Sequence, residues 1–415
     1  MSEPRSASER LSGVVGWRCA VCGTTVDVAT PYPFTCPRAT ADDRHHVLHP
    51  LDVGPQPASL EDPNPFVAYG PRLAWWAFAR ANGMTEQACI ALTHDVASGF
   101  TVTPFERSEP LSAELGIEVW VKDETGNVGG SHKGRHLVTA LLHLRAAEAL
   151  RMAEHPRRPL AIASCGNAAI AAAELALRSE WPIEVYVPEW ANELVAEALE
   201  RLGATVVYCE RRTSDPPGDP AVLRFREAVE EGAVPFSVQG PENALCLDGG
   251  RTIGWELTDA SVALDRVVAQ VGGGAFATCT GWGLGSAVRL DALEAEGCAP
   301  LARAWERATQ VPPDQIPARW SELMTPWEHP HSAAEGILDD ETYDWLGVFD
   351  VVRRSGGRIV VAPEEAIVRA HELGRSTGIP VSTTGSAGLA ALLTPDGTPT
   401  PGERVGVIFS GVDRF

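Results

Sequence analysis

Short apolar runs alternate with longer stretches of helical periodicity from about residue 66 to the end of the chain. Clusters of four to six apolar residues, many of them β-branched, predict buried strands, whereas longer amphipathic stretches predict helices. The predicted strands are 117–121, 159–163, 183–187, 205–209, 266–271 and 404–409. The predicted helices are 137–153, 167–178, 193–202, 363–378 and 386–393. This alternation predicts an α/β fold with parallel sheets covered by helices on both faces.

The N-terminal part of the chain differs from the remainder. Residues 17 to about 50 hold three of the nine cysteines and the polar run 42–46. Residues 51–65 contain four prolines, which is typical of an extended linker. Residues 298–340, rich in Pro and Trp, are expected to be irregular. We therefore predict a small module over residues 1–50, followed by a larger region over residues 51–415.

Charge and cysteine usage exclude several classes of protein. The 55 acidic and 34 basic residues give a net charge of −21, which disfavours nucleic acid and anionic membranes as partners. The odd cysteine number and scattered positions indicate a reducing compartment without a disulfide framework. Neither a signal peptide nor an apolar membrane span is evident in the sequence. We expect a soluble, cytoplasmic protein.

The sequence contains only two lysines, Lys122 and Lys133. Lys133 follows two glycines and precedes an apolar helix for which Ser131 is the expected N-cap. A lysine at the positive end of a helix, partly buried, has a lowered amine pKa, as a Schiff-base lysine requires. Lys122 follows a predicted strand beside Asp123 and Glu124, which would keep it charged and paired. We predict that Lys133 is the reactive amine.

Three further loops carry groups that suit ligand binding. The Ser164–Ala168 turn offers backbone N–H groups and the Asn167 amide to a carboxylate. The glycines of Gly272–Ala275 allow close approach to a phosphate. Hydroxyls cluster at residues 382–386, where they either cap a helix or contact a ring nitrogen. Ordinary turns and caps are the alternatives in each case.

A dinucleotide fingerprint is a competing interpretation of the glycine loop. Gly272, Gly274 and Ala277 fit its looser variant. That motif requires an acidic residue at the end of the next strand, whereas Asp291 falls in a stretch predicted to be helical.

Three cysteines near the N-terminus have the spacing of a zinc ribbon. Cys19 and Cys22 form a Cys-x2-Cys pair, and Cys36 follows. The usual fourth cysteine is missing, so we predict His46 as the fourth ligand, with His45 as the alternative. The predicted zinc site is structural; a degenerate ribbon without metal is the other possibility.

Taken in order, these segments resemble the fold-type II pyridoxal-phosphate enzymes, which belong to the tryptophan synthase β-like superfamily. The resemblance runs from about residue 101 to residue 415. It rests on the segments 103–116, 122–133, 164–167, 272–275, 381–392 and 407–411. It implies pyridoxal 5'-phosphate as cofactor and two interleaved three-layer subdomains, with the smaller at about 135–240. It also implies a homodimer acting on a small amino-acid substrate.

The resemblance also assigns roles to residues. Lys133 would hold the cofactor as an aldimine and move the Cα proton, while Asn167 would hydrogen-bond its phenolic oxygen. Thr384, or alternatively Thr383, would face the pyridine nitrogen, and this neutral hydroxyl favours elimination over transamination. The phosphate would bind the N–H groups of Gly272, Gly273, Gly274 and Ala275. The substrate carboxylate would bind Ser164, Cys165, Gly166, Asn167 and Ala168.

Within the family, residues 243–256 and the N-terminal cysteines resemble threonine synthase-like proteins. Their reaction also requires a cationic site for a substrate phosphate, for which Arg135 is a candidate. The Ser-His-Lys segment is closer to the tryptophan synthase β chain. The alternatives are a serine/threonine dehydratase and a cysteine synthase-like β-replacement enzyme. From other classes, the alternatives are a nicotinamide-dependent enzyme and a non-catalytic binding protein with a degenerate fold of this type.

Overall fold

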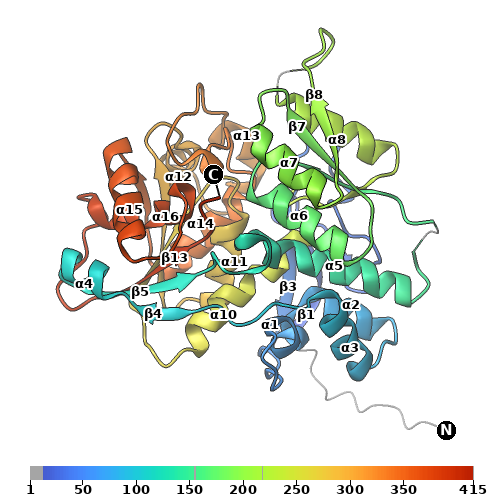
Figure 1. Ribbon diagram of the computed structural model, residues 1–415, viewed down its shortest axis with the longest axis horizontal. Helices are drawn as coiled ribbons and strands as arrows, with labels where there is room; N and C mark the ends of the chain where they lie inside the picture. The colour runs from blue at the N-terminus through green and yellow to red at the C-terminus, as the bar shows by residue number, and fades with distance from the viewer. Residues whose placement is uncertain (1–12, 154–155, 217, 415) are drawn as a thin grey trace.

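The chain folds around three β-sheets (Figure 1). The structure is a computed structural model that describes residues 13–153, 156–216 and 218–414. Two of the sheets form the two lobes of the molecule, and the third lies in the N-terminal segment beneath them. The predicted α/β architecture with parallel sheets is therefore confirmed.

The N-terminal sheet is small and antiparallel, with strand order β2-β1-β3. Its strands are β1 (Gly13–Cys19), β2 (Thr25–Asp27) and β3 (Leu48–Val53). Trp17 on β1 is fully buried, and its ring contacts His143 of helix α5 (Lys133–Ala149) edge-on, with centroids 6.1 Å apart. The sheet is thereby packed onto the main body of the molecule. β3 passes through residue 50, where the sequence predicted the module to end.

The larger lobe contains a six-stranded sheet of order β12-β11-β10-β13-β5-β4. All neighbours are parallel except the edge strand β4. The strands are β4 (Phe105–Arg107), β5 (Glu118–Asp123), β10 (Arg266–Gln270), β11 (Arg289–Ala295), β12 (Ile359–Ala362) and β13 (Arg404–Phe409). Helices pack against both faces of this sheet. They include α10 (Arg251–Asp259), α11 (Ala275–Leu284), α14 (Trp345–Ser355), α15 (Glu364–Ser376) and the 3-10 helix η5 (Ala387–Leu393).

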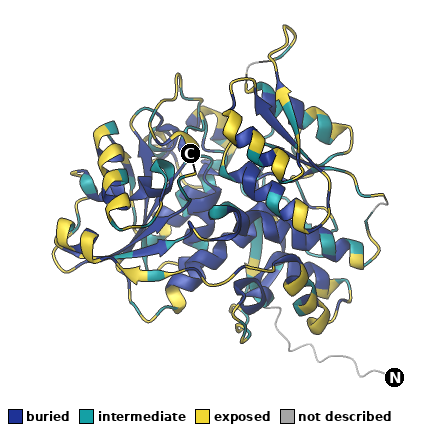
Figure 2. Cartoon of the chain, in the orientation of Figure 1, coloured by how far each residue is buried: buried dark blue, intermediate teal, exposed yellow. Residues whose placement is uncertain are grey.

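The smaller lobe contains a four-stranded parallel sheet of order β8-β7-β6-β9. Its strands are β6 (Leu160–Ala163), β7 (Ile183–Pro188), β8 (Thr205–Cys209) and β9 (Val234–Pro235). The helices of this lobe are α5 (Lys133–Ala149), α6 (Asn167–Arg178), α7 (Glu193–Arg201) and α8 (Pro220–Glu230). α5 and α6 are buried along most of their length (Figure 2), so they connect the lobe to the remainder of the body.

Shorter elements complete the chain. They are α1 (Pro65–Ala68), η1 (Gly70–Arg72), α2 (Ala74–Ala81), α3 (Glu86–Val96), α4 (Glu109–Leu115), η2 (Val128–Gly130), α9 (Cys246–Gly249), α12 (Pro300–Ala308), η3 (Pro317–Arg319), α13 (Trp320–Leu323), η4 (Glu335–Ile337) and α16 (Thr383–Ser386). In the described part of the chain, no helix combines the length and apolarity needed to cross a membrane.

Two predictions of secondary structure were wrong. Residues 298–340, expected to be irregular, contain the nine-residue helix α12 (Pro300–Ala308). The stretch around Asp291 forms strand β11 rather than a helix. Its two acidic residues are buried and have partners: Asp291 pairs with Arg266 at 3.0 Å, and Glu294 accepts hydrogen bonds from the N–H groups of Leu301 and Ala302 at the start of α12. Arg266 is distant from Asp291 in sequence, and the N–H groups that bind Glu294 lie beyond a turn. The local sequence pattern therefore did not indicate a strand.

Candidate active site

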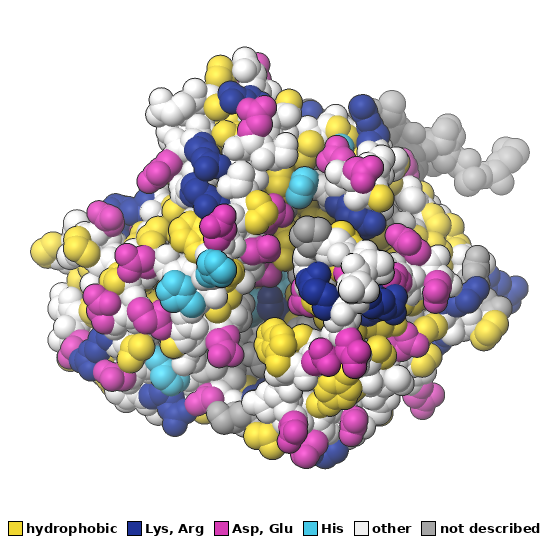
Figure 3. All heavy atoms as spheres, turned by 90° about the horizontal axis from the view of Figure 1, so that it is seen from above, with side chains coloured by type: hydrophobic (Ala, Val, Ile, Leu, Met, Phe, Trp, Pro, Cys, Tyr) yellow, Lys and Arg dark blue, Asp and Glu magenta, His cyan; other side chains and the backbone are white. Residues whose placement is uncertain are grey.

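The loops singled out in the sequence follow the carboxyl ends of parallel strands, where open α/β sheets bind ligands. The loop after β5 leads to Lys133, and the loop after β6 contains Ser164 and Asn167. The loop after β10 contains the glycines. In the large sheet β10 and β13 lie side by side, and the chain order changes direction there. Figure 3, which looks onto the top of Figure 1, shows this face hollowed near its centre.

Lys133 begins helix α5 and is half-buried. Burial lowers the pKa of its ammonium group, and the nearby Asp339 carboxylate opposes that shift. The N-cap is His132 rather than the predicted Ser131. Ser131 is extended and forms a bridge with Gly411, so its hydroxyl does not reach the helix N–H groups. The lysine is therefore fixed between the start of α5 and the residues that follow β13.

A buried ion network supports this helix start. Arg135 donates to Glu124 from Nε at 2.8 Å and to Glu256 from Nη1 at 2.5 Å. Lys122 pairs with Glu256 at 2.5 Å, not with its sequence neighbours Asp123 and Glu124. All four charged side chains are at most 1% exposed. Arg135 is therefore enclosed, which corrects its proposed contact with a substrate phosphate.

The Ser164–Ala168 loop lies at the start of α6. Asn167 Oδ1 accepts a hydrogen bond from Arg414 Nε at 3.1 Å. The Asn167 amide nitrogen faces Gly411, where a methyl group would lie only 2.8 Å from it. The Arg414 contact thus orients the amide, with its oxygen toward Arg414 and its nitrogen beside Gly411. Cys165 in the same loop has a raised thiol pKa because of burial and the nearby carboxylates of Asp219 and Glu335.

The glycine loop precedes helix α11, and Gly274 adopts a φ of +94°, which favours glycine. A methyl group on Gly272 would lie 2.6 Å from Oδ2 of Asp339. The Asp339 carboxylate accepts hydrogen bonds from the Gly273 N–H and the Tyr343 hydroxyl. Burial raises the pKa of Asp339 to about 6, against the effect of Lys133. The loop therefore already binds an anionic oxygen of the chain itself.

Two hydroxyl-bearing residues contact the side chain of Gln270, the last residue of β10. Gln270 Nε2 donates to the Ser410 hydroxyl at 2.7 Å and to the Thr384 carbonyl at 2.8 Å. The Thr384 hydroxyl accepts from the Gly336 N–H at 3.0 Å, while Ser382 caps α16 through the Gly385 N–H. Ser410 was not among the predicted site residues, although it follows the predicted strand 404–409 and therefore lies at the ligand-binding edge of the sheet.

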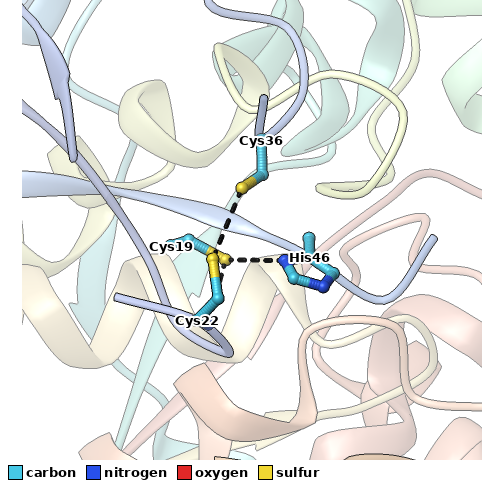
Figure 4. Close-up of side chains that lie close together, drawn as sticks. All are labelled: Cys19, Cys22, Cys36 and His46. Carbon is cyan, nitrogen blue, oxygen red and sulfur yellow. Dashed lines mark hydrogen bonds between the residues drawn. The ribbon is translucent and has the colours of Figure 1, made fainter. Parts of the chain in front are cut away.

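The N-terminal cysteines converge with His46 (Figure 4). The ligand atoms of Cys19, Cys22, Cys36 and His46 all lie within 4.8 Å of one another. Three thiols and one imidazole form a donor set that suits zinc. His46 also contacts Asp43 through Nε2 at 3.1 Å, a typical second contact of a metal-binding histidine. The alternative ligand, His45, instead stacks on Trp320 with ring centroids 3.6 Å apart.

Residues 96–411 match the family model described as "Pyridoxal-phosphate dependent enzyme". The chain belongs to this family. It is 28% identical over 305 residues to a threonine synthase from Methanosarcina acetivorans, covering 70% of this chain and 68% of that protein. In fold it is similar to maize serine racemase, with a TM-score of 0.64, 18% identity, and coverage of 79% and 93% of the two chains. It is likewise similar to a threonine deaminase from T.th., with a TM-score of 0.62, 23% identity, and coverage of 79% and 98%.

The residues of this pyridoxal-phosphate family member fit the cofactor's phosphate. Among the described residues, His132 Nε2, Thr278 Oγ1 and Thr342 Oγ1 are buried without a hydrogen-bond partner. Thr278 lies in the first turn of α11, and the methyl carbon of Thr342 would lie 3.0 Å from a Cβ on Gly274. The His132 ring contacts Phe276, with centroids 4.3 Å apart. These unpartnered polar atoms thus belong to residues that contact or follow the glycine loop, which suits a group with several oxygen atoms.

Proposed function

We propose that this protein is a pyridoxal-phosphate-dependent lyase or synthase that acts on an amino acid by elimination or β/γ-replacement. The observation that carries the proposal is the placement of Lys133 at a helix start, among loops that offer N–H groups to anions. The cofactor, when bound, supplies an electron sink for a carbanion at the Cα atom of the substrate. The chain's own residues then bind, orient and move protons.

Each site residue has a proposed task. Burial lowers the pKa of Lys133, so deprotonation to the neutral amine costs less free energy. The neutral amine would attach the cofactor and move the Cα proton. The N–H groups of Gly272, Gly273, Gly274 and Ala275, at the start of α11, would bind the phosphate. The N–H groups of Ser164, Cys165, Gly166, Asn167 and Ala168, at the start of α6, would bind the substrate carboxylate.

The remaining polar groups set the electronic character of the site. The Asn167 amide, oriented by Arg414, would donate to the cofactor's phenolic oxygen. Thr384 is the proposed partner of the ring nitrogen, and Ser410 is a second candidate from its position beside Gln270. Both hydroxyls accept a hydrogen bond from the protein, so each keeps its own proton to donate. A neutral donor at this position favours elimination.

A threonine synthase-like reaction is our first candidate. The sequence relatives favour it, and Arg414 provides a cation beside the Ser164–Ala168 loop. A substrate phosphate would then contact Arg414 rather than the enclosed Arg135.

A dehydratase-like reaction on serine or threonine is the second candidate. Asp339 lies near Lys133, and Asp219 and Glu335 lie near Cys165. These carboxylates repel a phosphorylated side chain but tolerate a hydroxyl. Assays of phosphate release from O-phosphorylated hydroxyamino acids, and of 2-oxo acid release from serine and threonine, separate the two candidates.

The test of the class uses borohydride reduction of the cofactor-loaded chain, followed by peptide mapping. Since the chain has two lysines, the map has two possible sites. We expect an adduct on Lys133 and none in K133A. An adduct on Lys122 would contradict the site assignment, and no adduct at either lysine would favour the binding-protein alternative.

We also propose a structural zinc ion at Cys19, Cys22, Cys36 and His46, and a homodimeric assembly of a cytoplasmic enzyme. The zinc proposal rests on the convergence of the four donors. The homodimer rests on the family resemblance, and sedimentation equilibrium of the full chain measures it directly.

A further inference from the structure

A direct polar contact connects the N-terminal sheet to the glycine loop. His49 on β3 places Nε2 2.6 Å from Oδ1 of Asp344, a residue 295 positions away. The Asp344 side chain is 0% exposed and the His49 side chain 17% exposed. The His49 ring also packs edge-on against Trp282 of α11, with centroids 4.9 Å apart. The contact is therefore enclosed by the protein.

Asp344 in turn touches the glycine loop through its backbone. Its N–H donates to the Gly273 carbonyl at 2.9 Å. A methyl group on Gly274 would lie 3.2 Å from the carbonyl carbon and oxygen of Asp344. The same carbonyl accepts the N–H groups of Gly347 and Val348 in the first turn of α14. Any displacement of Asp344 therefore moves the backbone that presents the Gly272–Ala275 N–H groups.

The buried Asp344 carboxylate depends on His49. Its other oxygen, Oδ2, has no hydrogen-bond partner among the described residues. An unpaired buried carboxylate is costly, so loss of the His49 contact would drive Asp344 toward solvent.

The position of His49 is set by the N-terminal sheet. His49 pairs with Arg18 on β1, next to the Cys19–Leu48 pair. Val47, which precedes β3, packs in one apolar cluster with Ala275 of the glycine loop and Cys279 of α11. The start of β3 thus contacts the loop region through both apolar and polar groups.

We propose that His49 is a positioning residue for the cofactor's phosphate. Through Asp344, the N-terminal sheet holds the Gly272–Ala275 N–H groups in the geometry that binds this group. The inference rests on the proposed function, because it assumes that this loop binds the phosphate of pyridoxal phosphate.

The test compares pyridoxal phosphate with pyridoxal, which lacks the phosphate. Both are titrated into the cofactor-free full chain, and the visible absorbance of the Lys133 adduct gives each dissociation constant. For His49→Leu we expect binding of pyridoxal phosphate to weaken about tenfold, or about 1.4 kcal/mol, with pyridoxal unchanged. His49→Gln, whose amide can still donate to Asp344, should restore most of the affinity. The matched control is His94→Leu, which removes the pair between the exposed His94 of α3 and Asp62, away from the glycine loop.

Equal weakening of both ligands in His49→Leu would overturn the proposal, since it would indicate general damage to the site. Unchanged binding of pyridoxal phosphate would overturn it as well. If His49→Leu does not fold, His49→Asn, which is polar but too short to reach Asp344, carries the same comparison. If the wild-type chain forms no adduct with either ligand, the proposed function fails, and this result is distinguishable from failure of the inference alone.

Discussion

The contact between Asp339 and the Gly273 N–H predicts how anion binding to the cofactor-free chain depends on pH. The carboxylate accepts this N–H, and its pKa is raised to about 6, with burial as the main cause. Above that pH, Asp339 is charged and competes with any anion for the loop. Below it, the protonated group is neutral and competes weakly. Anion affinity should therefore rise as the pH falls through about 6.

The magnitude follows from the fraction of protonated Asp339. With a pKa of about 6, roughly 3% of the chains carry the neutral carboxyl at about pH 7.5, and roughly 90% do so at about pH 5. If only the neutral form admits the anion, the apparent affinity rises about 30-fold between these conditions. This value is an upper bound, because a charged Asp339 can also be displaced.

Sulfate is the appropriate probe, because its charge stays constant over this pH range. Isothermal titration calorimetry of the cofactor-free full chain measures its affinity. In Asp339→Asn the side chain stays neutral, so the affinity should be high and nearly independent of pH. Glu341→Gln is the control, since burial raises the Glu341 pKa to about 7 without placing that carboxyl on the loop. The reasoning is refuted if Asp339→Asn keeps the pH dependence of the wild type, or if Glu341→Gln removes it.

Three further predictions concern the buried ion network around Arg135, the N-terminal cysteine cluster, and the hydroxyls of Thr384 and Ser410. Arg135→Met leaves buried carboxylates unpaired and should lower the free energy of unfolding by about 3–5 kcal/mol; Arg145→Met, in a surface pair, should cost under about 1 kcal/mol in the same urea titration. Cys36→Ser removes one of four donors, so the zinc content measured by atomic emission should fall well below one ion per chain. Thr384→Val should shift the visible absorbance of the loaded enzyme if Thr384 faces the ring nitrogen; a shift in Ser410→Ala alone would transfer that role to Ser410.

The sequence predicted well those elements whose stability is local. The helix 167–178 and the strands 205–209 and 404–409 have the observed bounds, because their apolar runs are bounded by turns. Strand β11 was missed because the ion-pair partner of Asp291 and the hydrogen-bond donors to Glu294 lie outside the strand.

In the candidate site, too, features set by local sequence could be predicted and features set by long-range contacts could not. The strand ends that carry Lys133, Asn167 and the glycines could be placed from motifs and the rule for open α/β sheets. Asp339 lies in a segment without periodicity, and Arg414 reaches Asn167 across 247 positions. Such long-range contacts leave no local pattern in the sequence. The limits of the module at 1–50 and of the smaller subdomain at 135–240 stay predictions, which limited proteolysis of the full chain can examine.

The scarcity of lysine has a practical consequence. Lys122 is 1% exposed and enclosed by its ion pair, whereas Lys133 is half-buried at the site. Apart from the α-amino group of the chain, Lys133 is therefore the amine most open to acylating reagents. Beyond that α-amino group, amine-reactive dyes, cross-linkers and biosensor surfaces would react at the site itself rather than at many surface positions. Since the two cysteines that are not buried, Cys22 and Cys165, belong to the proposed zinc site and the Ser164–Ala168 loop, immobilisation or labelling of this enzyme calls for tag-directed chemistry. A simple active ester then becomes a probe of whether the site is open.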